Sequence, residues 1–325
     1  MLYPFTFQPI FKERVWGGRN LERLYAKQLP AGKPIGESWE ISDRPDDASM
    51  ITNGPLAGRD LRWLMGNHAA ELLGEACALK GRFPLLIKLL DAQEKLSLQV
   101  HPPAHLAAAL GGEPKTELWH IAEAAPSAEL FVGLKHGVTH AEFELKLRDG
   151  SVADCFHRIP VRAGDTMFLP SGRVHAIGAG LVIFEIQQNS DTTYRVFDWN
   201  RLGLDGQPRE LHVPESLASI DFGDFEPSVV ASPEVTGPNF KCRLLLRDPL
   251  FSVFAFNAET RDRILWQRSP MCILGVVKGK LTMTSSAEAP TVVLESGAFC
   301  LVPAGLAVVE LWPEPGATFL QVEAG

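Results

Sequence analysis

Short apolar or alternating runs, each ended by glycine, proline or a polar cluster, recur along most of the chain. Runs of this length with such boundaries are typical of β-strands. They lie at residues 85–90, 96–101, 129–133, 166–169, 181–187, 251–256, 272–277, 299–302 and 318–322. The pattern therefore predicts a mainly β fold.

Helical periodicity interrupts this pattern in a few places. Asp60 is a capping residue ahead of one helical stretch, and Thr139 with Glu142 forms a capping box for another that Gly150 would end. A shorter helix is expected after the proline pair at 102–103. We predict that the helices are insertions into a β framework, at about 56–80, 103–111 and 139–150.

One element occurs twice in the chain. Residues 164–175 read G-x5-P-x-G-x2-H, and residues 297–305 repeat G-x5-P-x-G, with Val308 where the first copy has His175. Each copy predicts a turn, a short strand and a second turn. The full motif resembles the second motif of the cupins, which implies two jelly-roll barrels whose sheets close around a cavity.

The spacing of the two copies suggests two domains. We predict a catalytic cupin domain at 1–225 that contains the helical insertions, and a degenerate barrel without metal ligands at 239–325. The polar, proline-rich stretch between them is the expected linker.

Composition and charge narrow the class of protein. The 325 residues are 46% hydrophobic and 22% charged, which fits a folded globular chain. A net charge of −8 argues against a nucleic-acid partner, although a few local Lys and Arg residues can still bind an anion. There is no signal-peptide pattern and no apolar run long enough for a membrane span, so we expect a cytoplasmic protein. The five cysteines are widely spaced, which suggests reduced, buried thiols.

Four residues suggest a metal site. In the run 96–101, strict alternation places Ser97, Gln99 and His101 on one face, and alternation in the following extended segment places Lys115 beside Glu117. Gln99, His101, Glu117 and His175 offer oxygen and nitrogen donors that suit Zn²⁺ or another borderline divalent ion. Because none of these four ligands is a thiolate, we expect a catalytic rather than a structural ion.

Charged residues also occur where burial would be costly. Lys88 interrupts the apolar run 85–90, and Glu185 interrupts the run 181–187. Asp191, Arg195 and Arg201 follow in a polar segment. Lys88 could instead be an edge lysine that reaches solvent, and the polar segment could be a solvated loop with a surface ion pair.

Seven motifs in order resemble the type I mannose-6-phosphate isomerases in their short bacterial form. The resemblance extends over the whole chain. The motifs are WGG from Trp16, GESWE from Gly36, LIKLLD from Leu86, LQVHP from Leu98, KTELW from Lys115, PSGRVHAI from Pro170 and SDTTYR from Ser190.

This resemblance implies one zinc ion per chain and a site for a small phosphorylated sugar. The implied zinc ligands are Gln99, His101, Glu117 and His175. The residues implied to line the active site are Lys88, Lys115, Glu185, Asp191 and Arg195, with Trp16 at the pocket edge and Ser97 beside the phosphate. A monomer or a small homo-oligomer is expected.

The implied reaction interconverts mannose 6-phosphate and fructose 6-phosphate through a cis-enediol. We expect Lys115 and Arg195 to flank the reacting carbons, which requires a lowered pKa for Lys115. Glu185 or Asp191 could be the base instead. The phosphate could be bound by Arg195, Arg201 or Lys88.

Two other functions fit parts of the pattern. One is a different metal-dependent cupin enzyme that uses iron or manganese, such as a dioxygenase or another sugar-phosphate isomerase. The other is a non-catalytic sugar-binding module, which would not need Lys115, Glu185 and Arg195 together with four ligands.

Overall fold

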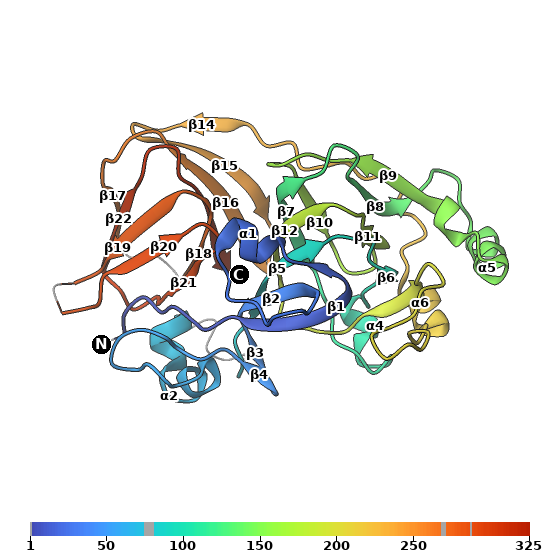
Figure 1. Ribbon diagram of the computed structural model, residues 1–325, viewed down its shortest axis with the longest axis horizontal. Helices are drawn as coiled ribbons and strands as arrows, with labels where there is room; N and C mark the ends of the chain where they lie inside the picture. The colour runs from blue at the N-terminus through green and yellow to red at the C-terminus, as the bar shows by residue number, and fades with distance from the viewer. Residues whose placement is uncertain (1, 75–80, 268–270, 287) are drawn as a thin grey trace.

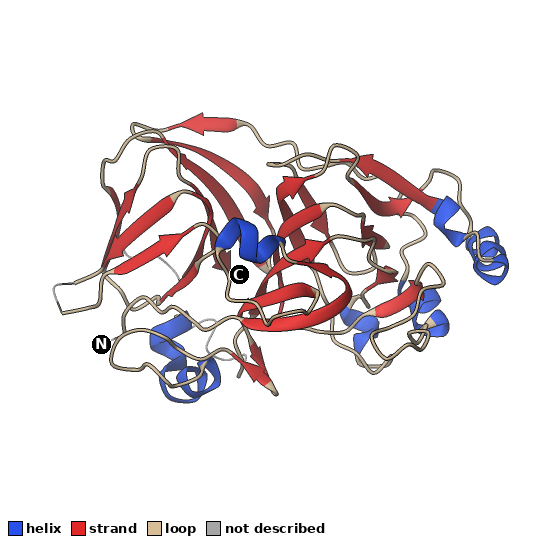
Figure 2. Cartoon of the chain, in the orientation of Figure 1, coloured by secondary structure: helices blue, strands red, loops and turns tan. Residues whose placement is uncertain are grey.

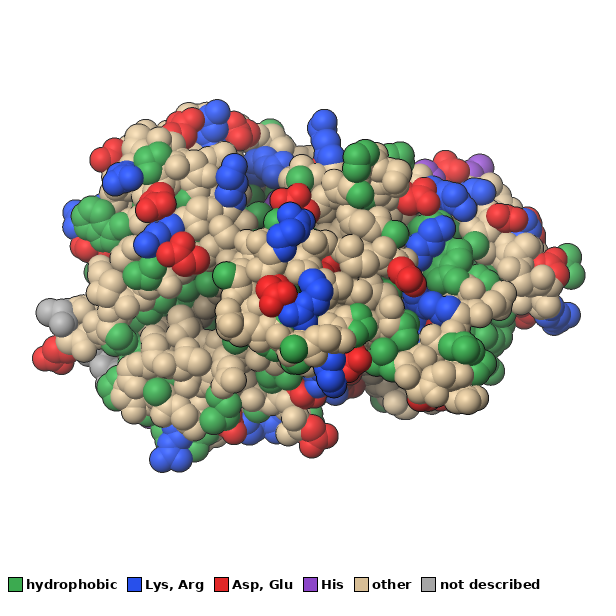
Figure 3. All heavy atoms as spheres, in the orientation of Figure 1, with side chains coloured by type: hydrophobic (Ala, Val, Ile, Leu, Met, Phe, Trp, Pro, Cys, Tyr) green, Lys and Arg blue, Asp and Glu red, His purple; other side chains and the backbone are tan. Residues whose placement is uncertain are grey.

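Strands predominate in the computed structural model, and the helices lie at its periphery (Figure 1, Figure 2). The structure describes residues 2–74, 81–267, 271–286 and 288–325. None of the described helices is long and apolar enough to cross a lipid bilayer. Acidic and basic side chains are interspersed over the face shown in Figure 3.

Two sheets from the first two thirds of the chain pack face to face. Buried residues from both, including Leu90, Trp119, Val132, Ile177 and Ile183, form one apolar cluster between them. The six-stranded sheet has the order β1 (Ile10–Gly18), β2 (Ile35–Ile41), β5 (Leu85–Ala92), β12 (Leu181–Gln188), β7 (Glu117–Ala124) and β10 (Thr166–Leu169). The five-stranded sheet has the order β13 (Tyr194–Phe197), β6 (Leu98–Val100), β11 (His175–Ile177), β8 (Glu129–Leu134) and β9 (Phe156–Pro160).

The last third of the chain forms a second pair of sheets around its own core. The larger sheet has the order β14 (Glu234–Thr236), β15 (Phe240–Arg247), β16 (Phe251–Ala258), β23 (Thr318–Ala324), β18 (Cys272–Lys278) and β21 (Phe299–Val302). The smaller has the order β17 (Ile264–Gln267), β22 (Val308–Pro313), β19 (Lys280–Thr284) and β20 (Val292–Glu295). A two-stranded ribbon of β3 (Asp43–Arg44) and β4 (Asp47–Ala48) lies apart from both pairs.

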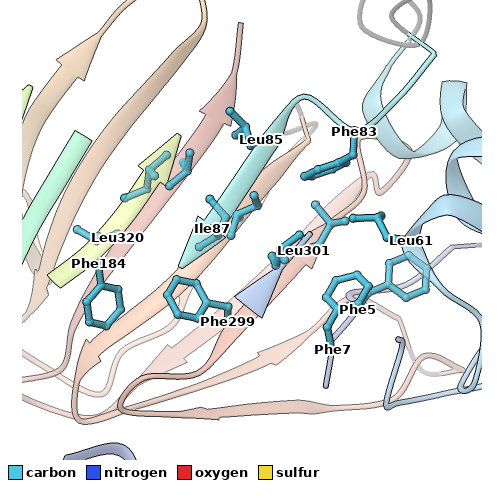
Figure 4. Close-up of a cluster of buried hydrophobic side chains, with 14 of the residues drawn as sticks. Phe5, Phe7, Leu61, Phe83, Leu85, Ile87, Phe184, Phe299, Leu301 and Leu320 are labelled. Carbon is cyan, nitrogen blue, oxygen red and sulfur yellow. The ribbon is translucent and has the colours of Figure 1, made fainter. Parts of the chain in front are cut away.

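A further apolar cluster joins the two halves (Figure 4). Ile87 and Phe184 come from the rear face of the first six-stranded sheet, and Phe299, Leu301 and Leu320 come from the C-terminal half. Near the amino terminus, Phe5 exchanges two backbone hydrogen bonds with Leu301, at 2.8 and 2.9 Å. The first sheet therefore has an apolar rear face and a front face toward the five-stranded sheet.

The helices begin where the capping residues predict. Asp60 accepts a hydrogen bond from the backbone N–H of Trp63 (2.6 Å), and Thr139 accepts one from that of Glu142 (3.2 Å). The expected helix at 103–111 is shorter, and residues 75–80 of the first predicted insertion lie outside the described residues. The helices in the described part of the chain are α1 (Asn20–Tyr25), α2 (Leu61–Leu73), α4 (Ala104–Ala107), α5 (His140–Asp149), α6 (Val213–Ser219) and the 3₁₀ turn η1 (Val152–Cys155).

Each run predicted as a strand overlaps an observed strand, so the mainly β fold is confirmed. The two predicted jelly-roll barrels are not confirmed. The described strands form several open sheets, and β1 and β10 end the first sheet without pairing to each other. The division at 225–239 stays a prediction. Cys155, Cys272 and Cys300 are buried and not in disulfides, Cys242 is half-buried, and Cys77 lies outside the described residues.

Candidate metal centre and active site

The four expected metal ligands converge between the two facing sheets. Gln99 and His175 are register partners on β6 and β11, His101 follows β6, and Glu117 begins β7 on the opposite sheet. Nε2 of His101 lies 3.3 Å from Glu117 Oε1, and Nε2 of His175 lies 3.8 Å from Glu117 Oε2. The amide nitrogen of Gln99 lies 3.2 Å from His175 Nε2. The ligand atoms of His101, Glu117 and His175 lie within 4.8 Å of one another.

Backbone carbonyls orient both histidines. Nδ1 of His101 donates to the carbonyl of Thr192 (2.8 Å), and Nδ1 of His175 donates to that of Arg173 (2.9 Å). Each Nε2 therefore carries a lone pair directed at Glu117, which is the arrangement a metal-binding histidine needs. Burial lowers the pKa of both rings, to about 3 for His175, so both are neutral at physiological pH.

Unpaired polar atoms support this assignment. Nε2 of His101 and Oε2 of Glu117 are buried and have no hydrogen-bond partner among the described residues. Burial alone would raise the pKa of Glu117, but the ammonium of Lys115 holds it well below its usual range. A buried carboxylate and two neutral imidazoles fit a zinc ion, and the Gln99 amide can turn its oxygen toward it.

Lys115 lies in direct contact with this centre. Its ammonium lies 2.7 Å from Glu117 Oε1. Burial favours the neutral amine, but the carboxylates of Glu117 and Glu185 outweigh it and raise the pKa of Lys115. The lowered pKa expected from the sequence depends on a bound zinc ion as well as on burial, so it stays a prediction.

Lys88 and Glu185 are register partners on the central strands β5 and β12. Their charged groups lie 3.2 Å apart, and both side chains are almost fully buried. Glu185 also accepts a hydrogen bond from Trp119 Nε1 at 2.9 Å. Lys88 is thus an interior lysine with a paired charge and not an edge lysine that reaches solvent.

A mixed-charge cavity of about 610 Å³ opens beside these residues. Gln99 and Lys115 line it, whereas His101, Glu117 and His175 are not among its lining residues. The other expected residues that line it are Trp16, Lys88, Ser97, Glu185, Asp191 and Arg195. Trp16 and Ser97 are buried, at 4% exposure each, whereas Asp191 is exposed.

Arg201 is the one expected site residue that the structure places elsewhere. Its guanidinium binds Asp198 (2.9 Å) and the carbonyl of Lys95, and it is not among the residues that line the cavity. Arg209, which was not expected from the sequence, binds the same carboxylate and does line the cavity.

The sequence interpretation also missed Arg14 and Glu37. Glu37 accepts two hydrogen bonds from the Arg14 guanidinium (2.9 and 3.3 Å) and one from Trp39 Nε1 (2.7 Å), and both charged residues line the cavity. Burial opposes ionisation of Glu37, but Lys88 and Arg14 lower its pKa to about 2. The sequence did contain a signal for Glu37, because alternation on β2 places Glu37 and Trp39 on one face.

Comparisons with known proteins identify the family. Residues 5–123 match the family model for the catalytic domain of phosphomannose isomerase type I. Probable mannose-6-phosphate isomerase GmuF from Bacillus subtilis is 37% identical over 80% of this chain and 82% of its own. Mannose-6-phosphate isomerase ManA from the same organism is 34% identical over 95% of both chains. The crystal structure of the mannose 6-phosphate isomerase from Bacillus subtilis superimposes with a TM-score of 0.89, at 29% identity over 99% of this chain and 100% of that one. The chain therefore belongs to the type I mannose-6-phosphate isomerases, a family of enzymes.

Proposed function

We propose that this protein interconverts mannose 6-phosphate and fructose 6-phosphate with one zinc ion per chain. The observation that carries the proposal is the convergence of two neutral histidines on the buried carboxylate of Glu117, next to the cavity. Gln99, His101, Glu117 and His175 would hold the ion. When bound, zinc would supply a positive charge that polarises sugar oxygens.

The isomerisation moves one proton between two neighbouring carbons. A base removes the proton from C2 of the open-chain aldose while the C1 oxygen gains a proton, which gives a cis-enediol; C1 then receives a proton while the C2 oxygen loses its hydroxyl proton and becomes the carbonyl. Lys115 is the proposed proton-transfer residue, because it lies at the wall of the cavity beside Glu117. Glu185 and Asp191 are the alternative bases, since both also line the cavity.

The remaining cavity residues would bind and orient the sugar. Arg195 is the register partner of Gln99, so it would hold oxygens near the reacting carbons. Ser97 lies further along the same strand face and would meet the phosphate end, while Trp16 would pack at the pocket edge. Lys88 is paired with Glu185 and would place its charge on the floor of the cavity.

A coupled assay tests the function directly. Purified protein is incubated with mannose 6-phosphate, fructose 6-phosphate is measured, and the assay is repeated after chelation and after adding zinc, iron or manganese back. We expect turnover that is lost on chelation and restored by zinc. Binding of the sugar without turnover would identify a sugar-binding module. Restoration by iron or manganese alone would indicate a different metal enzyme.

The proton-transfer role needs a separate experiment. With mannose 6-phosphate deuterated at C2, Lys115→Met should abolish loss of the label while zinc content stays unchanged. Glu185→Gln and Asp191→Asn serve as matched variants on the alternative bases. Normal label loss in Lys115→Met would exclude the lysine, and its loss in one of the other two would identify that residue as the base.

A further inference from the structure

A second cavity, of about 150 Å³, lies where the two halves of the chain meet, and we call it the junction cavity. Leu250 lines it from the C-terminal half and packs against the apolar cluster that joins the halves. No described residue lines both this cavity and the active-site cavity. The residues that line it from the first half of the chain are Arg82, Phe83, Pro84, Pro114, Gln188 and Asn189.

Hydrogen bonds fix the wall of the junction cavity. The buried Asn189 donates its side-chain amide to the carbonyl of Phe83 (2.8 Å) and its backbone N–H to that of Pro84 (2.9 Å). Pro84, Pro114 and Leu250 are half-buried and supply apolar surface, and the proline rings hold the backbone in place. The junction cavity is therefore a preformed site with mainly apolar walls, which is typical of small-molecule sites between packed units.

Two lining residues carry hydrogen-bond donors that are not engaged by the described part of the chain. The carboxamide oxygen of Gln188 accepts from the N–H of Thr116 (2.9 Å), and its nitrogen has no partner there. Arg82, 45% exposed, donates Nη1 to Glu113 (2.7 Å), and its Nε and Nη2 have no partner among the described residues. Glu113 also binds Arg44 (2.6 Å), so one carboxylate serves two guanidinium groups. Because Arg82 is the one charged residue in the described lining, the junction cavity favours an anion.

The wall of the junction cavity continues into the segments that carry active-site groups. Pro114 directly precedes Lys115, and Gln188 lies three residues after Glu185 on β12. The two segments are joined, because the N–H of Gln188 donates to the carbonyl of Thr116 (3.1 Å). A molecule in contact with Pro114 and Gln188 therefore acts on the same backbone that places Lys115 and Glu185 at the active-site cavity.

Size and charge indicate the class of ligand. A cavity of about 150 Å³ holds one benzene-sized ring. The proline and leucine walls favour an apolar ring, and the guanidinium of Arg82 with the amide nitrogen of Gln188 favours a carboxylate on that ring. We propose that the junction cavity binds a small aromatic or heteroaromatic carboxylate, and that the bound molecule changes the affinity of the active site for its sugar.

Binding is tested with para-fluorobenzoate as the probe, because fluorine NMR detects it without any turnover. The probe is titrated into the zinc-loaded protein, alone and with a saturating equilibrium mixture of mannose 6-phosphate and fructose 6-phosphate. We expect saturable binding in both samples, with dissociation constants that differ by about 3- to 10-fold, since coupling between two sites acts on both ligands equally. The neutral para-fluorobenzyl alcohol should bind more weakly than the carboxylate.

Variants locate the probe. Arg82→Gln should weaken binding of the carboxylate about 5- to 10-fold through loss of a charge-assisted hydrogen bond, and should leave binding of the alcohol unchanged. Leu250→Trp should abolish binding of both probes, because the larger side chain occupies the space of the ring. Arg263→Gln is the matched control, since Arg263 is 49% exposed, donates Nη1 to a glutamate at 2.7 Å and lines neither cavity. Unchanged turnover in Arg82→Gln would show that the variant is folded.

Arg195→Gln separates the two cavities, because Arg195 lines only the active-site cavity. Binding that is lost in Arg195→Gln and abolished by the sugar phosphates would place the probe in the active-site cavity and overturn the proposal. Absence of saturable binding, or equal affinity in the native protein, Arg82→Gln and Leu250→Trp, would also overturn it. Binding that depends on Arg82 but is unaffected by the sugars would refute the coupling. A protein that binds the probe through Arg82 and does not convert mannose 6-phosphate would keep the junction site and refute the proposed function.

Discussion

The buried Lys88 and Glu185 pair yields a quantitative prediction for stability. In Lys88→Met, the carboxylate of Glu185 stays in the interior and loses its cationic partner. The ammonium also lies 5.2 Å from the centre of the Trp39 ring, and that contact disappears as well. The variant keeps a side chain of similar length, so the lost charge dominates the effect.

The size of the effect follows from the 3.2 Å separation of the pair. With an effective dielectric constant of about 20, two unit charges at this distance attract by about 5 kcal/mol before desolvation is counted. Removing one partner from a buried pair costs about 3–5 kcal/mol in practice. We expect Lys88→Met to lose about 3 kcal/mol of unfolding free energy at pH 8.

The loss should shrink at lower pH. Burial already raises the pKa of Glu185 above its usual value, and removal of Lys88 raises it further. The folded protein then binds a proton more tightly than the unfolded chain does, so stability falls as pH rises. The fall begins near the unfolded pKa of about 4.3 and continues up to the raised folded pKa. The unfolding free energy of Lys88→Met should therefore be closer to that of the native protein at pH 5 than at pH 8.

Urea unfolding of samples with equal zinc content measures both effects. The control is a double variant that combines Lys88→Met with Glu185→Gln. The second substitution removes the buried negative charge and keeps an acceptor for Trp119 Nε1. We expect this double variant to recover most of the lost stability and to lose the added pH dependence. A single variant as unstable at pH 5 as at pH 8, or a double variant no more stable than the single one, would refute the reasoning.

Three further predictions concern the metal and the helices. Chelation should lower the melting temperature as well as activity, and zinc should restore both, because an ion bound only by the folded state stabilises it. His101→Gln should lose zinc in elemental analysis. His120→Gln should keep it, since His120 is buried on the opposite face of β7. Equal zinc content in the two variants would contradict the ligand assignment. Thr139→Ala should cost about 1 kcal/mol of stability through loss of the α5 cap, with unchanged turnover, as measured by urea unfolding and the coupled assay.

The sequence predicted those parts of the site that have a local signal. His175 was found through a motif of fixed spacing, and Lys88 and Glu185 were found because a charge inside an apolar run is costly without a partner. Arg209 has no such signal, because it lies in a polar loop that resembles any solvated loop. Both arginines bind Asp198, and only the tertiary structure shows that Arg209 lines the cavity whereas Arg201 does not, which is why the sequence favoured the wrong one of the two for the cavity wall.

The same alternation that predicts the site also explains why the C-terminal half matters to it. On β5, Lys88 faces the cavity while its neighbour Ile87 faces the apolar cluster shared with Leu301 and Leu320. On β12, Glu185 faces the cavity and Phe184 faces that cluster. The C-terminal sheet buries the rear of the strands that carry the charged residues, and burial on one face restricts the register of a strand strongly. The C-terminal half therefore keeps the facing charges in position although, within the described residues, it contributes no side chain to the cavity.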